Sequence, residues 1–178
     1  MRFALLAMAL SVISLPAAAL DWHVGVGVGT KLDGRTGDIP GADKHSDTPK
    51  LLLGGVTFKN DFGVEASWVD LGDISTTGLA DVGYDVGGDL WTLAATWSPD
   101  TGALRPFAKL GWFNRNEDGT SLTVGSPMPA SYHDSGVTAE LGGRWFINDT
   151  FALRGGYAWY DFDHHSDGNV QAALELHF

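Results

Sequence analysis

The stretch Asn169-Val-Gln-Ala-Ala-Leu-Glu-Leu-His-Phe178, which closes the sequence, decides the fold. Side chains at every second position of a β-strand point to the same face of the sheet. One face of this stretch is apolar and carries Val170, Ala172, Leu174, Leu176 and Phe178. The other face is small or polar and carries Gln171, Ala173, Glu175 and His177. An apolar outer face with a polar inner face is typical of a strand in a membrane-spanning β-barrel.

The start of the chain predicts a secretory signal peptide. Arg2 supplies a positive charge, residues 3–15 are largely apolar, and small alanines follow them, as signal peptidase requires. We therefore expect residues 1–19 to be the signal peptide and residues 20–178 to form one outer-membrane β-barrel domain. The alternative interpretation of the first segment is an N-terminal core helix.

The composition limits the function classes that fit this chain. The net charge is −11, which argues against nucleic acid as a partner because binding phosphates needs lysine and arginine. The sequence has no cysteine, which excludes a thiol nucleophile and thiolate metal sites. Its 24 glycines suit a curved barrel wall, and its 7 tryptophans suit membrane interfaces.

The chain after the signal peptide contains eight alternating stretches, and bacterial single-chain barrels have an even number of strands. They cover residues 21–31, 50–59, 62–70, a stretch ending at 97, 105–116, 132–147, 151–160 and 169–178. Short turns at 60–61, 98–104 and 148–150 alternate with polar segments expected to be long loops, at 32–49, 71–81, 117–130 and 161–168. The pattern predicts an all-β protein, an eight-stranded antiparallel up-and-down transmembrane β-barrel.

Aromatic residues on the apolar face form two belts, which we expect at the two membrane–water interfaces. The belt near the short turns comprises Trp22, Phe58, Phe62, Trp97, Trp145, Phe151 and Phe178. The belt near the long loops comprises Trp68, Trp112 and Trp159. A soluble barrel or sandwich would show the same alternation with its apolar face turned inward. The signal peptide, the belts and the scarcity of charges on the polar face favour the membrane.

Two internal segments carry a family resemblance. Residues 58–72 read FKNDFGVEASWVDLG, and residues 142–162 read GGRWFINDTFALRGGYAWYDF. Together with the closing strand, they resemble the transmembrane domain of the OmpA-like outer-membrane β-barrel family. The resemblance implies a place in the bacterial outer membrane (cell envelope), contact with outer-membrane lipids and lipopolysaccharide, and insertion by a barrel-assembly machinery for which Phe178 is a signal.

The same resemblance implies a function without enzymatic activity. Family members serve in envelope structure and in surface interaction through their extracellular loops, and some are porin-like, with small pore activity. We expect this chain to be a non-enzymatic outer-membrane barrel of that kind and a monomer.

Six charged residues are predicted to face the lumen by their position in the alternation: Glu65, Lys109, Glu140, Arg144, Arg154 and Glu175. An eight-stranded barrel is narrow enough to be filled by its own side chains, so charges inside it must pair. Three acids and three bases therefore predict a closed salt-bridge network across the lumen.

The alternative interpretation of this lumen is a small-conductance pore gated by its salt bridges. The resemblance implies that lumen Glu, Lys and Arg side chains exchange partners in the family, and Glu65 and Arg154 match family positions. Ala94 stands where the family has a lysine, and Arg144 stands where the family has a glutamate. We hypothesise that Lys109 replaces the missing lysine as the partner of a lumen glutamate.

Candidates for catalysis or metal binding are weak. His164, His165 and Ser166 are residue types that lipid A deacylases use, so a lipid A-modifying enzyme is the less favoured alternative. The surrounding deacylase pattern is missing, so we expect a solvated loop and no catalytic residue. Histidines at the loop end, including His45 and His133, could bind zinc, and acidic loops could bind divalent cations. For both, simple solvation is the favoured interpretation, and we expect no metal and no cofactor.

Overall fold

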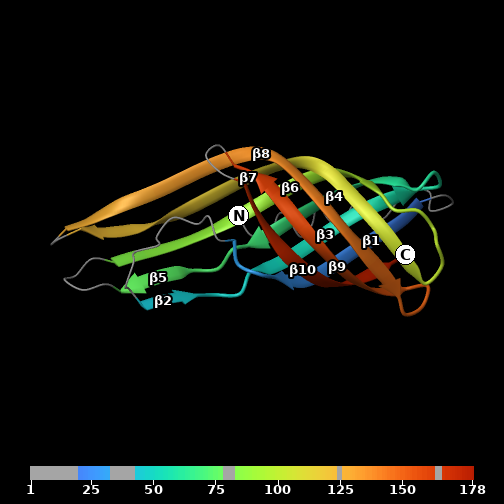
Figure 1. The fold of residues 1–178 in the computed structure, drawn as a ribbon, viewed down its shortest axis with the longest axis horizontal. Helices are drawn as coiled ribbons and strands as arrows, with labels where there is room; N and C mark the ends of the chain where they lie inside the picture. Colours follow the sequence, from blue (N-terminus) through green and yellow to red (C-terminus); the bar gives the residue numbers. More distant parts are fainter. Residues whose placement is uncertain (1–19, 33–42, 78–82, 124–125, 163–165) are drawn as a thin grey trace.

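A single antiparallel sheet closes into a barrel in the computed structural model, which describes residues 20–32, 43–77, 83–123, 126–162 and 166–178 (Figure 1). Within these residues lie ten strands: β1 (Leu20–Gly29), β2 (Asp43–Ser46), β3 (Lys50–Phe58), β4 (Phe62–Asp70), β5 (Ile74–Thr77), β6 (Gly83–Trp97), β7 (Leu104–Thr123), β8 (Ser126–Phe146), β9 (Phe151–Asp161) and β10 (Ser166–His177). The described residues contain no helix that is long and apolar enough to cross a membrane.

Eight of the described strands form the ring, in the order β6-β4-β3-β1-β10-β9-β8-β7, and the pairing of β7 with β6 closes it. The first and last strands, β1 and β10, meet at a seam where Trp22 and Phe178 exchange two backbone hydrogen bonds of 3.0 and 2.9 Å. The structure therefore confirms the predicted eight-stranded antiparallel up-and-down barrel. The short strands β2 and β5 lie outside the ring. Strand β5 pairs with the outer end of β6 on one side and with β2 on the other.

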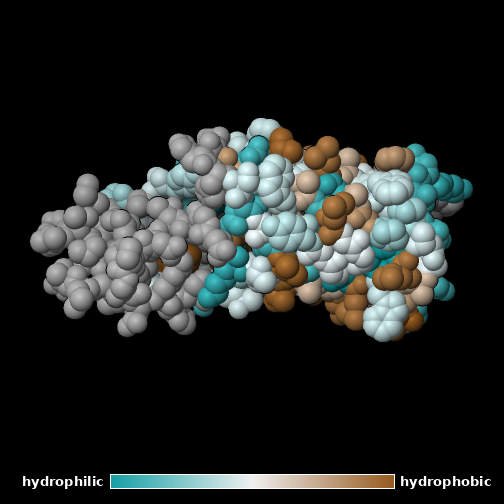
Figure 2. Space-filling view, viewed as in Figure 1, coloured by the Kyte–Doolittle hydropathy of each residue, from teal (hydrophilic) through white to brown (hydrophobic). Residues whose placement is uncertain are grey.

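The two faces of the wall carry opposite kinds of side chain. Leu141, Leu110 and Val26 point outward and are 68, 63 and 61 % exposed, whereas Glu140, next to Leu141, points inward and is buried. A water-soluble protein would bury such leucines, so this wall is built to contact an apolar solvent. Figure 2 shows apolar side chains spread over the barrel wall, between smaller and aromatic residues. The assignment of faces from the alternation is confirmed.

Two tight turns close one end of the barrel. Asp61 takes a positive φ of 67° between β3 and β4, and its N–H donates to the carbonyl of Phe58 at 3.1 Å. Aspartate is one of the few residues that adopt this left-handed conformation readily. Between β8 and β9, the side-chain oxygen of Asn148 accepts hydrogen bonds from the N–H groups of Thr150 and Phe151. Short turns mark the periplasmic end of such a barrel.

The hairpin of β7 and β8 is the largest departure from the sequence prediction. The expectation of a loop over 117–130 is wrong, because β7 continues to Thr123, β8 begins at Ser126, and Gly119 pairs with Ala130. Figure 1 shows this hairpin running beyond the ends of β9 and β10. Where the hairpin leaves the membrane, both of its faces can be polar, so the apolar alternation that reveals a strand in sequence is lost.

Three other predicted loops are also partly wrong. Strand β2 lies within the segment 32–49, β5 lies within 71–81, and β10 begins at Ser166 inside the segment 161–168. Each of these segments is paired with a neighbouring strand: β2 with β5, β5 with β6, and the start of β10 with β9. The backbone hydrogen bonds of these pairs stabilise the segments, and the local sequence pattern does not reveal them. The wall therefore continues as a sheet beyond the membrane-spanning ring.

Candidate functional site

The lumen is the candidate functional site, because it gathers charged side chains that the wall hides from lipid. The six charged residues predicted to face inward come from β4, β7, β8, β9 and β10, and their side chains are at most 7 % exposed. The structure brings all of them into one connected set of ion pairs, here called the lumen network: Glu65, Lys109, Glu140, Arg144, Arg154 and Glu175.

Arg154 is the centre of the lumen network. Its Nη1 lies 2.8 Å from Oε2 of Glu65 and 3.1 Å from Oε1 of Glu175. Its Nη2 lies 2.7 Å from Oε1 of Glu140. The planar guanidinium group can donate to several carboxylates at once, which a lysine cannot do with fixed geometry. One side chain on β9 therefore binds acids that come from β4, β8 and β10.

Arg144 and Lys109 complete the pairing. Arg144 donates from Nε to Glu175 at 2.8 Å and from Nη2 to Glu65 at 3.2 Å. Lys109 places its Nζ 2.7 Å from Oε1 of Glu65 and 2.5 Å from Oε2 of Glu140. Each acid of the lumen network thus contacts at least two bases. Such pairing is needed here, because a buried charge without a partner costs several kcal/mol.

Small and aromatic residues shape the space around the lumen network. The ring of Phe107 packs under the guanidinium carbons of Arg144 and Arg154, at 4.9 and 4.3 Å, in cation–π geometry. A Cβ at Gly142 would lie 2.6 Å from the Phe107 ring, and a Cβ at Gly156 would lie 2.8 Å from Oε1 of Glu140. The glycines on β8 and β9 therefore make room for the ring and the carboxylate.

Two histidines extend the lumen network toward the periplasmic rim, and sequence reasoning did not include them. His23 Nε2 lies 3.2 Å from Oε2 of Glu65. His177 places Nε2 3.2 Å from Oε2 of Glu175 and Nδ1 3.1 Å from Oδ1 of Asp21. The available signal was the alternation itself, because His177 follows Glu175 by two residues and so shares its inward face.

One group of potential metal ligands lies where the histidines meet the lumen network. Among the described residues, ligand atoms of His23, Glu65 and Glu175 lie within 4.8 Å of one another. Both carboxylates are already bound by the guanidinium groups of Arg144 and Arg154. A divalent cation would have to sit beside two fixed positive charges, so this cluster fits ion pairing and does not fit a metal.

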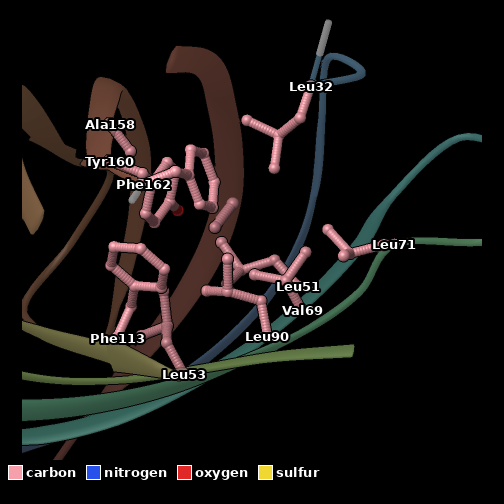
Figure 3. Packing of buried hydrophobic residues seen from close by; sticks show 11 residues of the cluster. Leu32, Leu51, Leu53, Val69, Leu71, Leu90, Phe113, Ala158, Tyr160 and Phe162 are labelled. Atoms are coloured by element: carbon pink, nitrogen blue, oxygen red, sulfur yellow. The ribbon is translucent and has the colours of Figure 1, made fainter. Parts of the chain in front are cut away.

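An apolar layer fills the lumen at the long-loop end of the strands (Figure 3). Phe113 is completely buried in this layer and meets the rings of Tyr160 and Phe162 edge-on, with centroids 5.4 and 5.0 Å apart. The layer is completed by aliphatic and aromatic side chains from the facing strands: Leu32, Leu51, Leu53, Val69, Leu71, Leu90, Phe113, Ala158, Tyr160, Phe162 and Ala173. The barrel interior therefore contains a charged layer toward the short turns and an apolar layer toward the other end.

A second buried ion pair borders the apolar layer. Arg115 Nη2 lies 2.8 Å from Oε2 of Glu117, and both side chains are 1 % exposed. The guanidinium carbon of Arg115 also lies 5.2 and 5.0 Å from the ring centres of Tyr132 and Phe162. Sequence reasoning missed this pair. Arg115 shares the inward face of Lys109, but Glu117 fell in a segment expected to be a loop.

A small cavity lies between the charged layer and the apolar layer. Its volume is about 10 Å³, which is the room that one water molecule needs. It is lined by the methyl group of Ala94 and by hydroxyl, amide and charged side chains: Ser67, Thr92, Lys109, Thr138, Glu140, Tyr160 and Gln171. A cavity of this size holds about one buried water and is too small to serve as a passage by itself.

The predicted belts lie on the outside of the wall. In the periplasmic belt Phe58, Phe62, Trp97, Trp145, Phe151 and Phe178 are exposed and Trp22 is half-buried. In the other belt Trp112 is exposed, while Trp68 and Trp159 are half-buried. Trp68 donates from Nε1 to Asp89 at 3.3 Å, so its polar edge has a partner at the boundary of the barrel. Such placement suits rings that sit at headgroup level.

Of the residues considered for catalysis or zinc binding, His164 and His165 lie outside the described residues. Ser166 is exposed and its hydroxyl donates to Asp161 at 3.1 Å, and the exposed His133 bonds Asn116 at 2.7 Å. His45 lies on β2, in register with Ser75 of β5.

The family follows from this geometry and from comparison. A family model described as outer membrane protein beta-barrel domain matches residues 4–178. The chain belongs to this family. It is an OmpA-like, outer-membrane β-barrel protein of the bacterial cell envelope, as the resemblance implied. A search of curated proteins gave no match.

Solved structures agree with this family. Ail of Yersinia pestis, in complex with the heparin analogue sucrose octasulfate, has a TM-score of 0.62 and 12 % identity, over 89 % of this chain and 99 % of Ail. OprG of Pseudomonas aeruginosa has a TM-score of 0.59 and 16 % identity, over 90 % of this chain and 96 % of OprG. The N-terminal β-barrel domain of Pseudomonas aeruginosa OprF has a TM-score of 0.56 and 13 % identity, over 88 and 97 % of the two chains. At these identities the likeness shows the fold alone.

Proposed function

We propose that this protein is a non-enzymatic envelope barrel that holds an extracellular sheet for surface interaction. The observation that carries the proposal is the long β7–β8 hairpin, which with β2, β5 and the outer end of β6 continues the wall beyond the membrane. Loops and extensions held by a rigid scaffold are where recognition is usually placed. The lumen beneath is filled by the lumen network and the apolar layer, which supports a role as a scaffold.

The negative charge of the chain limits which molecules the extracellular sheet can bind. Described side chains on the extension that are exposed include Asp73, Asp85 and Asp118, and the whole chain carries a net charge of −11. A sulfated polyanion such as the one bound to Ail would be repelled by such a surface. We infer a neutral or cationic partner, with lipopolysaccharide and outer-membrane lipids around the wall and a monomeric barrel.

Shortening the hairpin tests this function. Residues 116–133 would be replaced by an Asn-Gly turn, which joins the two strands close to the membrane. Bacteria producing the shortened protein should still contain a barrel that migrates differently on gels before and after boiling. They should lose adherence to cationic and neutral surfaces to which bacteria with the whole protein adhere. Equal adherence of both strains would contradict surface interaction through this sheet.

A gated pore is the second candidate, and one observation favours it. Glu65 and Glu140 are each bound by both Lys109 and Arg154, so each acid keeps one partner if one of these two bases moves away. Such redundancy would allow ion pairs to exchange at low cost. The apolar layer must open as well, because it fills the lumen above the lumen network. We therefore rank the pore below the scaffold, and conductance measurements decide between them.

The enzyme alternative is ranked last. Ser166 donates its hydroxyl to Asp161, whereas a serine nucleophile needs its hydroxyl bonded to an oriented base. Mass analysis of lipid A from cells with and without the protein should show identical species, and a missing acyl chain in cells that contain the protein would overturn this ranking.

A further inference from the structure

His177 lies between two carboxylates at the periplasmic rim of the lumen. Its Nδ1 is 3.1 and 3.2 Å from the two carboxylate oxygens of Asp21, and its Nε2 is 3.2 Å from Oε2 of Glu175. An ionised carboxylate can only accept a hydrogen bond, and a neutral imidazole has a single N–H to donate. Both contacts are satisfied together only if both ring nitrogens carry a proton.

We propose that His177 is a charged, pH-sensitive clamp on the seam that closes the barrel. In its imidazolium form it binds Asp21 of β1 and Glu175 of β10, the two strands that meet at the seam. Glu175 is kept ionised by Arg144 and Arg154, which donate to its oxygens at 2.8 and 3.1 Å. Asp21 has a side chain that is 40 % exposed, so water also supports its ionised form.

His23 is the second member of the histidine pair at the rim. Its ring stacks on that of His177, with centroids 5.3 Å apart and planes 24° apart. Its Nε2 contacts Glu65, and its buried Nδ1 has no hydrogen-bond partner. A proton on Nδ1 would be a buried donor without an acceptor and would place a second positive charge against the His177 ring. The proton therefore belongs on Nε2 of His23 alone.

The charge balance of the lumen network and the adjacent periplasmic rim agrees with this assignment. The bases Lys109, Arg144 and Arg154 already match the acids Glu65, Glu140 and Glu175. Asp21 brings a fourth acid, and the His177 imidazolium supplies the fourth base. The ring of Phe146 lies 4.7 Å from His177, and Arg105, Asn148 and Asp149 line the same rim pocket as Asp21. Arg105 pairs with Asp100 at 3.1 Å, and the amide oxygen of Asn148 accepts from the N–H groups of Thr150 and Phe151. The ring nitrogens of His177 bond to Asp21 and Glu175.

The clamp lies next to the backbone hydrogen bonds that join β1 and β10 at the end of the seam. His177 pairs with His23 across the seam, and its N–H donates to the carbonyl of Thr150 at 2.7 Å. The next residue, Phe178, makes the final backbone pair with Trp22. Loss of the imidazolium proton leaves a nitrogen lone pair facing a carboxylate. This removes an ionic link between β1 and β10 and weakens the strand pairing at the end of the seam.

The pH dependence follows from the proton count. Above about pH 6.5 an unfolded histidine is mostly neutral, whereas the folded clamp still holds its second proton. Unfolding then releases a proton, so the unfolding equilibrium constant rises as pH rises, by at most about tenfold per pH unit from this one site. The stabilisation is complete below that range and is lost once the folded protein also releases the proton.

Nuclear magnetic resonance of ring nitrogens tests the assignment in the whole protein. Protein labelled with ¹⁵N-histidine and held in detergent micelles at pH 7 should show His177 with two protonated nitrogens and His23 with one. The variants His177→Gln and His23→Gln assign the two sets of signals. A neutral His177 ring at pH 7, or a charged His23 ring, would overturn the proposal.

Unfolding in urea tests the clamp itself, between pH 6 and pH 9. The whole protein and the His23→Gln variant should both become easier to unfold as pH rises, while the His177→Gln variant should lack this component. In the Asp21→Asn variant, which changes an exposed rim residue, the loss should begin at a lower pH. Identical pH profiles for the whole protein and His177→Gln would refute the clamp, even if the nitrogen signals were as expected.

Discussion

Lys109 on β7 reaches over β6 to Glu65 on β4, and the two side chains form a buried ion pair of 2.7 Å. The residue of β6 directly opposite Glu65 is Ala94, whose small side chain points inward. A long side chain there would occupy the space between lysine and glutamate. The same ammonium group binds Glu140, so it joins acids from two sides of the lumen.

Reversing the charge of Lys109 should strongly destabilise the lumen network. Lys109→Glu places a third acid beside Glu65 and Glu140, and we expect a loss of about 3–5 kcal/mol in the free energy of unfolding. If the lumen conducts, single-channel conductance in planar bilayers should change as well. The control is Lys59→Glu, in an exposed position next to the β3–β4 turn. Silent bilayers for both the wild type and Lys109→Glu would leave only the structural role.

Removing Arg154 should be as costly as reversing the charge of Lys109, because it is the centre of the lumen network. Arg154→Met keeps much of the volume but leaves Glu65, Glu140 and Glu175 without their shared partner. We expect a loss of about 3–5 kcal/mol, read from tryptophan fluorescence during unfolding in urea. Arg105→Met removes a partly exposed pair with Asp100 and the contact of its guanidinium with the Phe146 ring, and it should cost only about 1 kcal/mol. Equal costs for the two variants would show that the burial of the lumen network does not matter.

An arginine on the outer wall should distinguish a lipid-facing surface from a solvated one. Leu141 is 68 % exposed between the belts, and Leu141→Arg should cost about 2–4 kcal/mol in a lipid bilayer. Ile147→Arg, in the turn after β8, should cost at most about 1 kcal/mol because that position is close to water. Both are measured by unfolding in lipid vesicles, and a harmless Leu141→Arg would argue against membrane contact at that position.

Truncating the centre of the apolar layer should test whether it closes the lumen. Phe113→Ala removes a completely buried ring and should cost about 3–5 kcal/mol. In planar bilayers, Lys109→Glu combined with Phe113→Ala should conduct more than Lys109→Glu alone if both layers block the path. The control is Trp112→Ala, which removes an exposed ring from the outer face of the same strand. Equal conductance with and without Phe113 would assign closure to another part of the lumen.

Prediction from sequence worked best where one face of a strand meets lipid. The alternation around Leu141 and Val26 revealed the wall, since an apolar solvent on one side and a polar lumen on the other impose a period of two. It failed over residues 117–130, where the hairpin stands in water and neither face must be apolar. The strand there depends on pairing with β6, which no local pattern records.

The sequence alone determined the architecture, the assignment of faces and the inward position of charges such as Glu65 and Arg154, because parity along a strand is a local property. Only the tertiary structure decided which charges meet, since Lys109 and Glu65 are far apart in the chain and come together through closure of the ring. It also decided that His177 lies between Asp21 and Glu175. That position exists only because the first and last strands pair, and pairing across a closed sheet is a property of the whole barrel.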